Sequence, residues 1–235
     1  MQPLIFIALF SFCIATSYSQ TAIDYYNMGV AKSRSNDYSG AIQDYTKAIQ
    51  LDSNYVLGYL NRGVAKSQLK DYIGAIQDYT KSIELDPKFA FAYDNRGVIK
   101  NQIKDYSGAL QDFTKAIELD PNYVNAYFYR AIAKQGLKDY SGVIEDYTKA
   151  IELDPKYVDA YFFRAIAKGK LNDYSTAITD YTKTIELDPK YVYAYYNRGV
   201  LKLILNDKNG GCLDFRKAGE LGYEKAYESI KKYCH

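Results

Sequence analysis

Residues 90–123 read AFAYDNRGVIKNQIKDYSGALQDFTKAIELDPNY, and the pattern of this stretch decides the fold. Apolar and aromatic residues recur at helical spacing over residues 92–103 and again over residues 108–119. Asp105 stands between the two runs, where its side chain can cap the second helix. Asp120-Pro121 offers a similar start signal for the helix that follows. We therefore predict a pair of helices joined by a short turn, with another helix to come.

The same pattern repeats along most of the chain. The Asp-Pro pair at Asp86-Pro87 returns at residues 120, 154 and 188, so the repeat length is 34 residues. Helices of about twelve residues are marginal alone in water, so their stability must come from stacking on neighbours. We expect a last polar helix, from about Glu224 to Tyr233, to cap the array. The register has no insertion and defines six units, 22–55, 56–89, 90–123, 124–157, 158–191 and 192–225, followed by a C-terminal cap tail, 226–235.

Small and aromatic residues recur at fixed positions of every unit. The first helix carries an aromatic residue and a small residue four positions later, whereas the second helix carries a small residue and an aromatic residue four positions later. A small residue lets two helices approach closely while the rings fill the space beside it. In chain order the four sets are Tyr25, Tyr59, Tyr93, Tyr127, Tyr161 and Tyr195; Gly29, Gly63, Gly97, Ala131, Ala165 and Gly199; Ala41, Ala75, Ala109, Val143, Ala177 and Gly211; and Tyr45, Tyr79, Phe113, Tyr147, Tyr181 and Phe215.

With these residues the chain resembles the tetratricopeptide repeat (TPR) family, in which aromatic and small residues recur on a 34-residue period. The resemblance covers nearly all of residues 22–225. It implies an all-α protein, a right-handed α–α superhelical solenoid of six helix pairs plus a C-terminal capping helix. It also implies a scaffold that binds a protein or peptide in a concave groove, because such solenoids present extended concave binding surfaces.

One departure from the family pattern places a charged residue where the family has an apolar one. The family usually has Leu before the small residue of the first helix, whereas this chain has Met28 and then Arg62, Arg96, Arg130, Arg164 and Arg198. An isolated buried Arg is costly, so each should have a partner. We expect each Arg to meet the Asp of the preceding unit, which leaves Met28 where no preceding Asp exists. The alternative is that the Arg side chains extend into solvent. The expected pairs are Asp44–Arg62, Asp78–Arg96, Asp112–Arg130, Asp146–Arg164 and Asp180–Arg198.

The resemblance also places a partner groove on the first helices. Some family members grip a C-terminal carboxylate with Lys and Asn, but the positions matching the lysines are not cationic here, which disfavours a clamp for chaperone tails. We expect Tyr26, Phe128, Phe162 and Tyr196 to be exposed, because aromatic residues anchor interfaces. Packing against neighbours is an equally good interpretation of the Val and Ile row. The predicted groove residues are Tyr26, Leu60, Asp94, Phe128, Phe162, Tyr196, Val98, Ile132 and Ile166.

Composition excludes several functional classes. Lys and Arg number 30 against 28 Asp and Glu, so the net charge of +2 gives no footprint for nucleic acid. The single histidine, His235, makes histidine-based catalysis or a histidine metal site improbable. The chain also shows no nucleophile–base pair, phosphate-binding glycine loop or metal-ligand spacing. We predict a non-catalytic protein with no cofactor, no metal and no small-molecule substrate.

The N-terminus differs from the rest of the chain. Residues 4–14 are almost continuously apolar, and residues 1–23 carry no charged side chain. Ser17 and Ser19 fit the small-x-small pattern of a signal-peptide cleavage site. We expect residues 1–19 to be a cleaved signal, which makes the protein periplasmic or secreted. The alternative is a membrane-anchored adaptor in which residues 4–19 stay as an uncleaved anchor.

Two cysteines follow the predicted cleavage site, Cys212 and Cys234. Each lies about ten residues from Gly222, which resembles a glycine that ends a helix, so an antiparallel pair would hold the cysteines at similar depth. An even number of cysteines in an exported protein favours a disulfide. Free buried thiols are the alternative. Near-identical units also permit self-association by end-to-end stacking.

Overall fold

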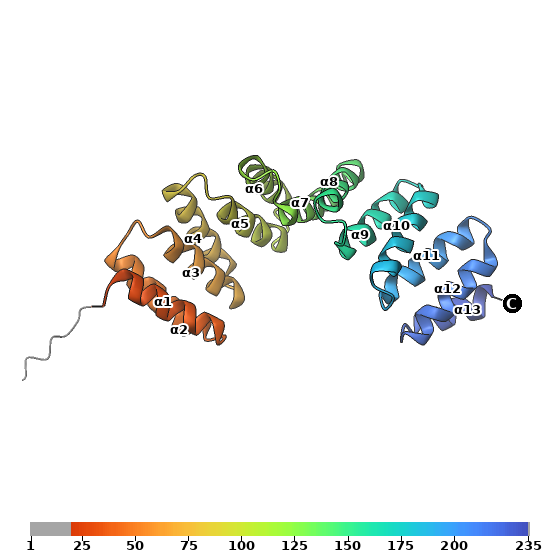
Figure 1. Cartoon of the computed structure of the whole chain (residues 1–235), viewed down its shortest axis with the longest axis horizontal. Coiled ribbons are helices and arrows are strands. Elements are labelled where there is room, and N and C mark those ends of the chain that lie inside the picture. Colours follow the sequence, from red (N-terminus) through yellow and green to blue (C-terminus); the bar gives the residue numbers. More distant parts are fainter. Residues whose placement is uncertain (1–19, 235) are drawn as a thin grey trace, which may run out of the picture.

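The computed structural model describes residues 20–234, so the predicted signal at 1–19 lies outside the described residues. Within residues 20–234 the chain forms thirteen α-helices in an all-α array, which confirms the predicted fold class (Figure 1). Their bounds are α1 Ala22–Arg34, α2 Tyr38–Leu51, α3 Val56–Gln68, α4 Tyr72–Leu85, α5 Ala90–Gln102, α6 Tyr106–Leu119, α7 Val124–Gly136, α8 Tyr140–Leu153, α9 Val158–Lys170, α10 Tyr174–Leu187, α11 Val192–Ile204, α12 Lys208–Glu220 and α13 Lys225–Tyr233.

The helices pack in chain order and build a superhelical arch. Each odd-numbered helix packs against the even-numbered helix that follows it, and that helix packs against the next odd-numbered one. In addition, α1 contacts α3, α3 contacts α5 and α5 contacts α7. Direct contacts between odd-numbered helices mean that these helices lie on the inner side of the curve. At the top of the arch, α6 and α8 accordingly lie outside α7 (Figure 1).

The turn inside each helix pair follows the predicted chemistry. Lys104, with a φ of 66°, takes the left-handed conformation that reverses the chain after α5. Asp105 then caps α6, because its side chain accepts a hydrogen bond from the backbone N–H of Gly108. Equivalent Asp caps start α2, α4, α8, α10 and α12.

The predicted role of the Asp-Pro pair is wrong. Asp120 ends α6, and the next helix begins only at Val124, without a side-chain cap. The Asp120 side chain instead accepts a hydrogen bond from the N–H of Asn122, and its carbonyl accepts one from the N–H of Tyr123. The pair therefore closes a turn between two units.

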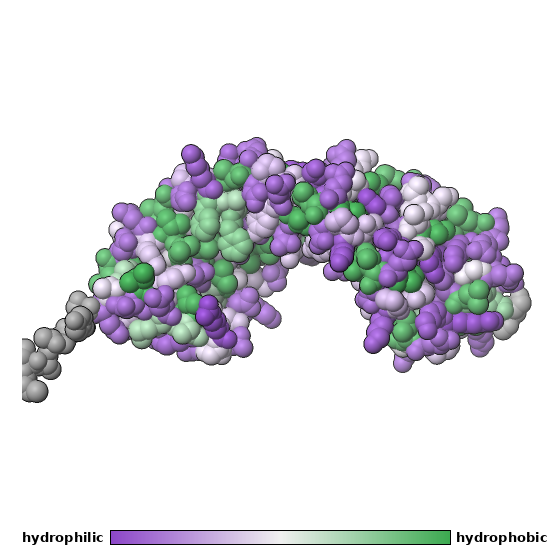
Figure 2. Space-filling view, viewed as in Figure 1, coloured by the Kyte–Doolittle hydropathy of each residue, from purple (hydrophilic) through white to green (hydrophobic). Residues whose placement is uncertain are grey.

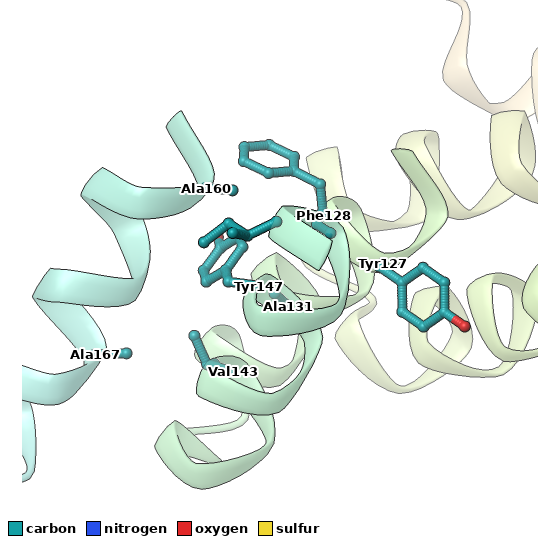
Figure 3. Close-up of a cluster of buried hydrophobic side chains, with 9 residues drawn as sticks. Tyr127, Phe128, Ala131, Val143, Tyr147, Ala160 and Ala167 are labelled. Atoms are coloured by element: carbon teal, nitrogen blue, oxygen red, sulfur yellow. The ribbon is translucent and has the colours of Figure 1, made fainter. Parts of the chain in front are cut away.

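The small residues seat the aromatic rings as predicted. A Cβ atom placed on Gly63 would lie 2.7 Å from the Tyr79 ring, so the ring fills the space that a side chain at position 63 would need. Around α7 and α8 the equivalent contact is between Ala131 and Tyr147, both fully buried. Figure 3 shows Tyr147 and Val143 together with Ala160 and Ala167 of α9, which close the cluster from the next unit. The core is thus continuous from pair to pair.

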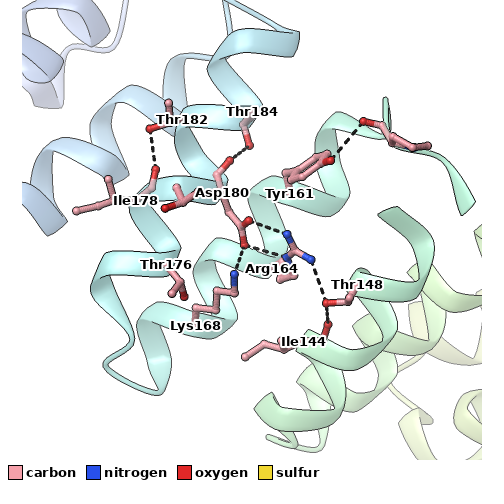
Figure 4. Close-up of polar contacts among 12 residues, drawn as sticks. Ile144, Thr148, Tyr161, Arg164, Lys168, Thr176, Ile178, Asp180, Thr182 and Thr184 are labelled. Carbon is pink, nitrogen blue, oxygen red and sulfur yellow. Dashed lines mark hydrogen bonds and ion pairs between the residues drawn. The ribbon is translucent and has the colours of Figure 1, made fainter. Parts of the chain in front are cut away.

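Each Arg that stands before the small residue of a first helix belongs to an ion cluster, but its Asp partner is not the predicted one. Arg164 donates to both carboxylate oxygens of Asp180, at 2.9 and 2.7 Å, and Asp180 lies in the same unit (Figure 4). Lys168 approaches the same carboxylate at 2.8 Å. The preceding unit supplies only Thr148, whose hydroxyl accepts from Arg164 Nη1 at 3.0 Å. The predicted pairs Asp44–Arg62, Asp78–Arg96, Asp112–Arg130, Asp146–Arg164 and Asp180–Arg198 are therefore corrected to Arg62–Asp78, Arg96–Asp112, Arg130–Asp146, Arg164–Asp180 and Arg198–Asp214.

The first unit shows why Met28 replaces Arg. Asp44 is paired there with Lys32 alone, at 2.6 Å. No helix of the described chain precedes α1 to supply the threonine, and Met28 is 38% exposed. An Arg at this position would keep its Asp but lose the neighbouring hydroxyl.

The C-terminal helix closes the last pair. Gly222, with a φ of 97°, reverses the chain after α12, as a C-terminal glycine does. Helix α13 has 9 residues, against 13 in α11. A disulfide between Cys212 and Cys234 joins the end of α13 to the first half of α12. Between residues 20 and 234, no helix has the length and apolar character needed to cross a membrane.

Candidate partner-binding surface

The odd-numbered helices offer the candidate surface. We call the second, fifth, sixth and ninth residues of the units, on α1, α3, α5, α7, α9 and α11, the inner surface. In the third unit these residues are Phe91, Asp94, Asn95 and Val98. In Figure 2 an apolar patch lies over α5, among polar side chains. In the third unit the inner surface therefore combines apolar residues, Phe91 and Val98, with polar ones, Asp94 and Asn95.

The structure buries several of the predicted groove residues. Phe128 and Phe162 are 8% and 7% exposed, so the expectation that they are exposed is wrong. Leu60 and Asp94 are also buried, at 3% and 6%. Half-buried residues make up the rest of the predicted set: Tyr26, Val98, Ile132, Ile166 and Tyr196.

Junction residues, the aromatic residues that immediately precede an odd-numbered helix, explain this burial. Tyr157 stacks on Phe128 with ring centroids 4.9 Å apart, and Tyr191 covers Phe162 at 4.7 Å. Tyr55 lies against Tyr26 at 5.1 Å in the same way. The ring that precedes the next helix therefore closes over the fifth residue of each unit. The junction residues are Tyr55, Phe89, Tyr123, Tyr157 and Tyr191, and Tyr223, two residues before α13, takes the same place over Tyr196.

The third unit replaces this apolar contact with a polar one. Its fifth residue is Asp94, and the hydroxyl of Tyr123 donates a hydrogen bond to Asp94 Oδ2 at 3.0 Å. Asp94 Oδ1 is buried and has no hydrogen-bond partner. Burial raises the pKa of Asp94 to about 6, and the Tyr123 hydroxyl offsets part of that rise. Burial, together with the nearby Asp94 carboxylate, also raises the pKa of Tyr123.

Residues that the sequence did not single out complete the surface. Phe91 is 47% exposed and stacks on Tyr123 with a centroid distance of 6.4 Å. Asp159, on α9, is half-buried and accepts a hydrogen bond from Tyr191 at 2.9 Å. A signal was available, because the junction aromatic recurs every 34 residues with the unit.

The inner surface ends in a recess next to the capping helix. The recess has a volume of about 860 Å³ and lies between α11 and α13. Its apolar lining includes Tyr196, Val200 and Leu203, and its polar lining includes Glu228 and Lys232. Part of the apolar flank of α11 is thus open beside the short last helix. Among the described residues, no three His, Cys, Asp or Glu side chains are grouped to hold a metal ion.

Several solved structures are similar to this chain. MamA protein is 26% identical and superposes with a TM-score of 0.67, over 72% of this chain and 92% of the MamA chain. A tetratricopeptide repeat protein from Parabacteroides merdae is also 26% identical, with a TM-score of 0.63 over 90% of this chain and 82% of that one. YrrB, described as a TPR protein with an unusual peptide-binding site, is 22% identical, with a TM-score of 0.70 over 80% of this chain and 97% of its own.

Sequence models of the family give the direct identification. A search of curated proteins found no match. Models described as tetratricopeptide repeat match residues 56–89, 90–123 and 124–157, and a model described as TPR repeat matches residues 33–70 and 167–203. These matches together span most of the helical array. The chain belongs to the tetratricopeptide repeat family.

Proposed function

We propose that this protein is an exported scaffold that holds a protein or peptide against its inner surface and catalyses no reaction. The observation that carries the proposal is that the second position holds an apolar or aromatic side chain in four of the six units, and all four are exposed on the inner helices. These are Ile23, Leu57, Phe91 and Tyr193, with exposed fractions of 56%, 41%, 47% and 55%. Large exposed apolar residues grouped on one face mark interaction sites in soluble proteins.

The family supports the same role. Tetratricopeptide repeat proteins are scaffolds for protein interactions, and YrrB carries a peptide-binding site by its description. The carboxylates that recur on the second helices of this chain are held in ion clusters with Arg and Lys. They stabilise the array, and the proposal assigns them no chemistry.

Site-specific photo-crosslinking tests the inner surface. A photoreactive amino acid would replace Phe91 in one variant and Ile73 in a matched control, because Ile73 is 74% exposed but lies on α4. We expect crosslinked partners from position 91 in intact cells and few from position 73. The same adducts at both positions would contradict the proposed face.

The export part of the proposal rests on the sequence. Residues 4–14 are apolar, and Ser17 and Ser19 precede the expected cleavage point. N-terminal sequencing of protein from its source cells should begin at Gln20. A chain that begins at residue 1 and stays with the membrane would favour the alternative, an adaptor anchored through residues 4–19.

A further inference from the structure

The inner surface carries two carboxylates that the chain does not neutralise. At the second, fifth, sixth and ninth positions of the six units, the only charged side chains are Asp94 and Asp159. Neither is among the ion pairs that the described residues form with Lys or Arg. Negative charge is therefore concentrated in the third and fifth units.

Asp94 breaks a rule that the rest of the chain follows. Seven Asp side chains are buried among the described residues, and all but Asp94 have at least one Lys or Arg partner. Asp94 receives only the neutral hydroxyl of Tyr123, and its Oδ1 remains unpaired. A buried charge without a counter-ion is costly, so Asp94 would gain more than the other buried acids from a cation supplied by a ligand.

Asp159 repeats the arrangement two units further along. Its Oδ1 also accepts only a tyrosine hydroxyl, from Tyr191 at 2.9 Å. The residue is half-buried, so solvent or a ligand reaches its carboxylate. Both carboxylates are thus held in place by junction tyrosines, and neither is neutralised by them.

Aromatic rings beside the first carboxylate complete a surface for a cationic side chain. Phe91 is 47% exposed and stacks on Tyr123, whose hydroxyl points at Asp94. A Lys or Arg packs its apolar stem on such rings and is attracted by their faces as well as by a nearby carboxylate. No Lys or Arg occupies the inner positions to compete for these places.

We propose that the inner surface binds a peptide segment that carries Lys or Arg among apolar residues. One cationic side chain lies over Phe91 and Tyr123, and a second lies beside Asp159. The apolar neighbours pack on the exposed second-position residues such as Leu57. This inference rests on the proposed scaffold function and names the chemistry of its partner.

Three labelled peptides of one pattern test the charge preference. In each, Leu or Phe alternates with a single polar residue: Lys in the first, Gln in the second and Glu in the third. Fluorescence anisotropy with the purified protein measures each affinity. We expect the Lys peptide to bind about tenfold more tightly than the Glu peptide at low salt, and the difference to shrink as salt rises. The protein's net charge of +2 favours the opposite order, so this preference has to be local.

Paired variants locate the effect. D94N/D159N removes both inner carboxylates without changing side-chain size, and we expect it to lose most of the preference for the Lys peptide. E84Q/E118Q removes two negative charges from the even-numbered helices α4 and α6, where both residues are exposed, and should keep the preference.

The outcomes separate the two proposals. Equal or reversed affinities for the Lys and Glu peptides, or a preference that survives D94N/D159N, would overturn the cationic partner. If the cationic partner is overturned in this way but peptide still crosslinks at position 91, the proposed scaffold function remains supported. Failure of all three peptides to bind, with no crosslink at position 91 in cells, would contradict both proposals.

Discussion

Asp112 and Asp94 lie in the same unit and are buried to nearly the same degree, at 3% and 6% exposure, yet their surroundings are opposite. Asp112, between helices, receives Arg96 at 2.9 and 2.7 Å and Lys100 at 2.8 Å. Asp94, on the inner surface, receives only Tyr123. The first arrangement recurs in every unit from the second to the sixth, whereas Asp94 is the one buried Asp of the described residues that has no Lys or Arg partner. Recurrence with the unit marks a structural cluster, and the exception marks a candidate site.

The second unit offers the apolar counterpart of Asp94. Leu60 occupies the same fifth position, and Phe89 lies against it where Tyr123 lies against Asp94. The backbone is the same in both places, so the side chains alone set the difference. The variants below alter either the surroundings of Asp94 and its apolar counterpart or the ion cluster of Asp112.

Moving the acid into the second unit should have the largest effect. L60D places a carboxylate against Phe89, which has no hydroxyl to donate, and also removes a buried Leu. We expect a loss of about 5 kcal/mol in unfolding free energy. Urea unfolding of L60D and of L60D/F89Y would measure it, and the added Tyr should restore about 1 kcal/mol through its hydrogen bond. No recovery in the double variant would show that Tyr123 does not support Asp94 as described.

Removing the structural acid should come next. D112N keeps the shape of the side chain but leaves Arg96 and Lys100 without a counter-ion, at a cost of about 4 kcal/mol. The urea midpoint of unfolding should fall, and amide hydrogen exchange should become faster in α5 and α6. A variant as stable as the parent would mean that solvent already neutralises this cluster.

The pH dependence of stability should reveal the unpaired acid. The pKa of Asp94 is raised in the folded protein from 3.8 to about 6, so the folded state holds this proton more tightly than the unfolded state. Its contribution to stability is therefore complete below about pH 4 and is lost as the pH rises through 6, by about 3 kcal/mol.

The matched variant for this effect is D94N, which does not titrate. The difference in unfolding free energy between the parent and D94N should fall between pH 4 and pH 6 and then stay constant. A difference that does not change with pH would show that Asp94 titrates normally.

The smallest effect should come from the link between units. T80V removes the hydroxyl that accepts from Arg96 Nη1 at 3.0 Å and leaves the Arg96–Asp112 pair intact. We expect a loss of about 1 kcal/mol, typical of one hydrogen bond. A loss as large as that of D112N would mean that the threonine, and not the Asp, holds the cluster together.

Much of the fold was predictable because it depends on residues that recur. The small residue of each first helix and the ring that it seats, such as Gly63 and Tyr79, fix how two helices meet. The turn between them was predictable from Asp105, whose cap is a local interaction. Such short-range features follow from residue type and spacing alone.

The partners across helices were not predictable in the same way. Arg and Asp recur with one period, so spacing alone does not decide whether Arg96 meets Asp78 or Asp112. The direction of the side chains decides which Asp is the partner, and Arg96 points across its own helix pair to Asp112. Lys100 was overlooked although it also recurs with the unit.

The candidate surface was predicted less well than the fold. Phe128 and Phe162 belong to the right helices, but their burial depends on Tyr157 and Tyr191, about 29 residues further along the chain. Asp94 was included only because of its position in the unit. What distinguishes it, a carboxylate without a counter-ion, is visible only when its neighbours are known.

The ion clusters have a consequence for how such a chain changes its length. Each half-buried Arg of the ion clusters pairs with an acid of its own unit, and the preceding unit contributes only a neutral hydroxyl. If residues 90–123 were deleted, Arg130 would keep Asp146, and Thr80 would take the place of Thr114. The ion cluster at the new junction would therefore stay complete. Duplication or loss of whole units therefore leaves these ion clusters intact, and arrays of this kind can lengthen or shorten without a compensating mutation in them.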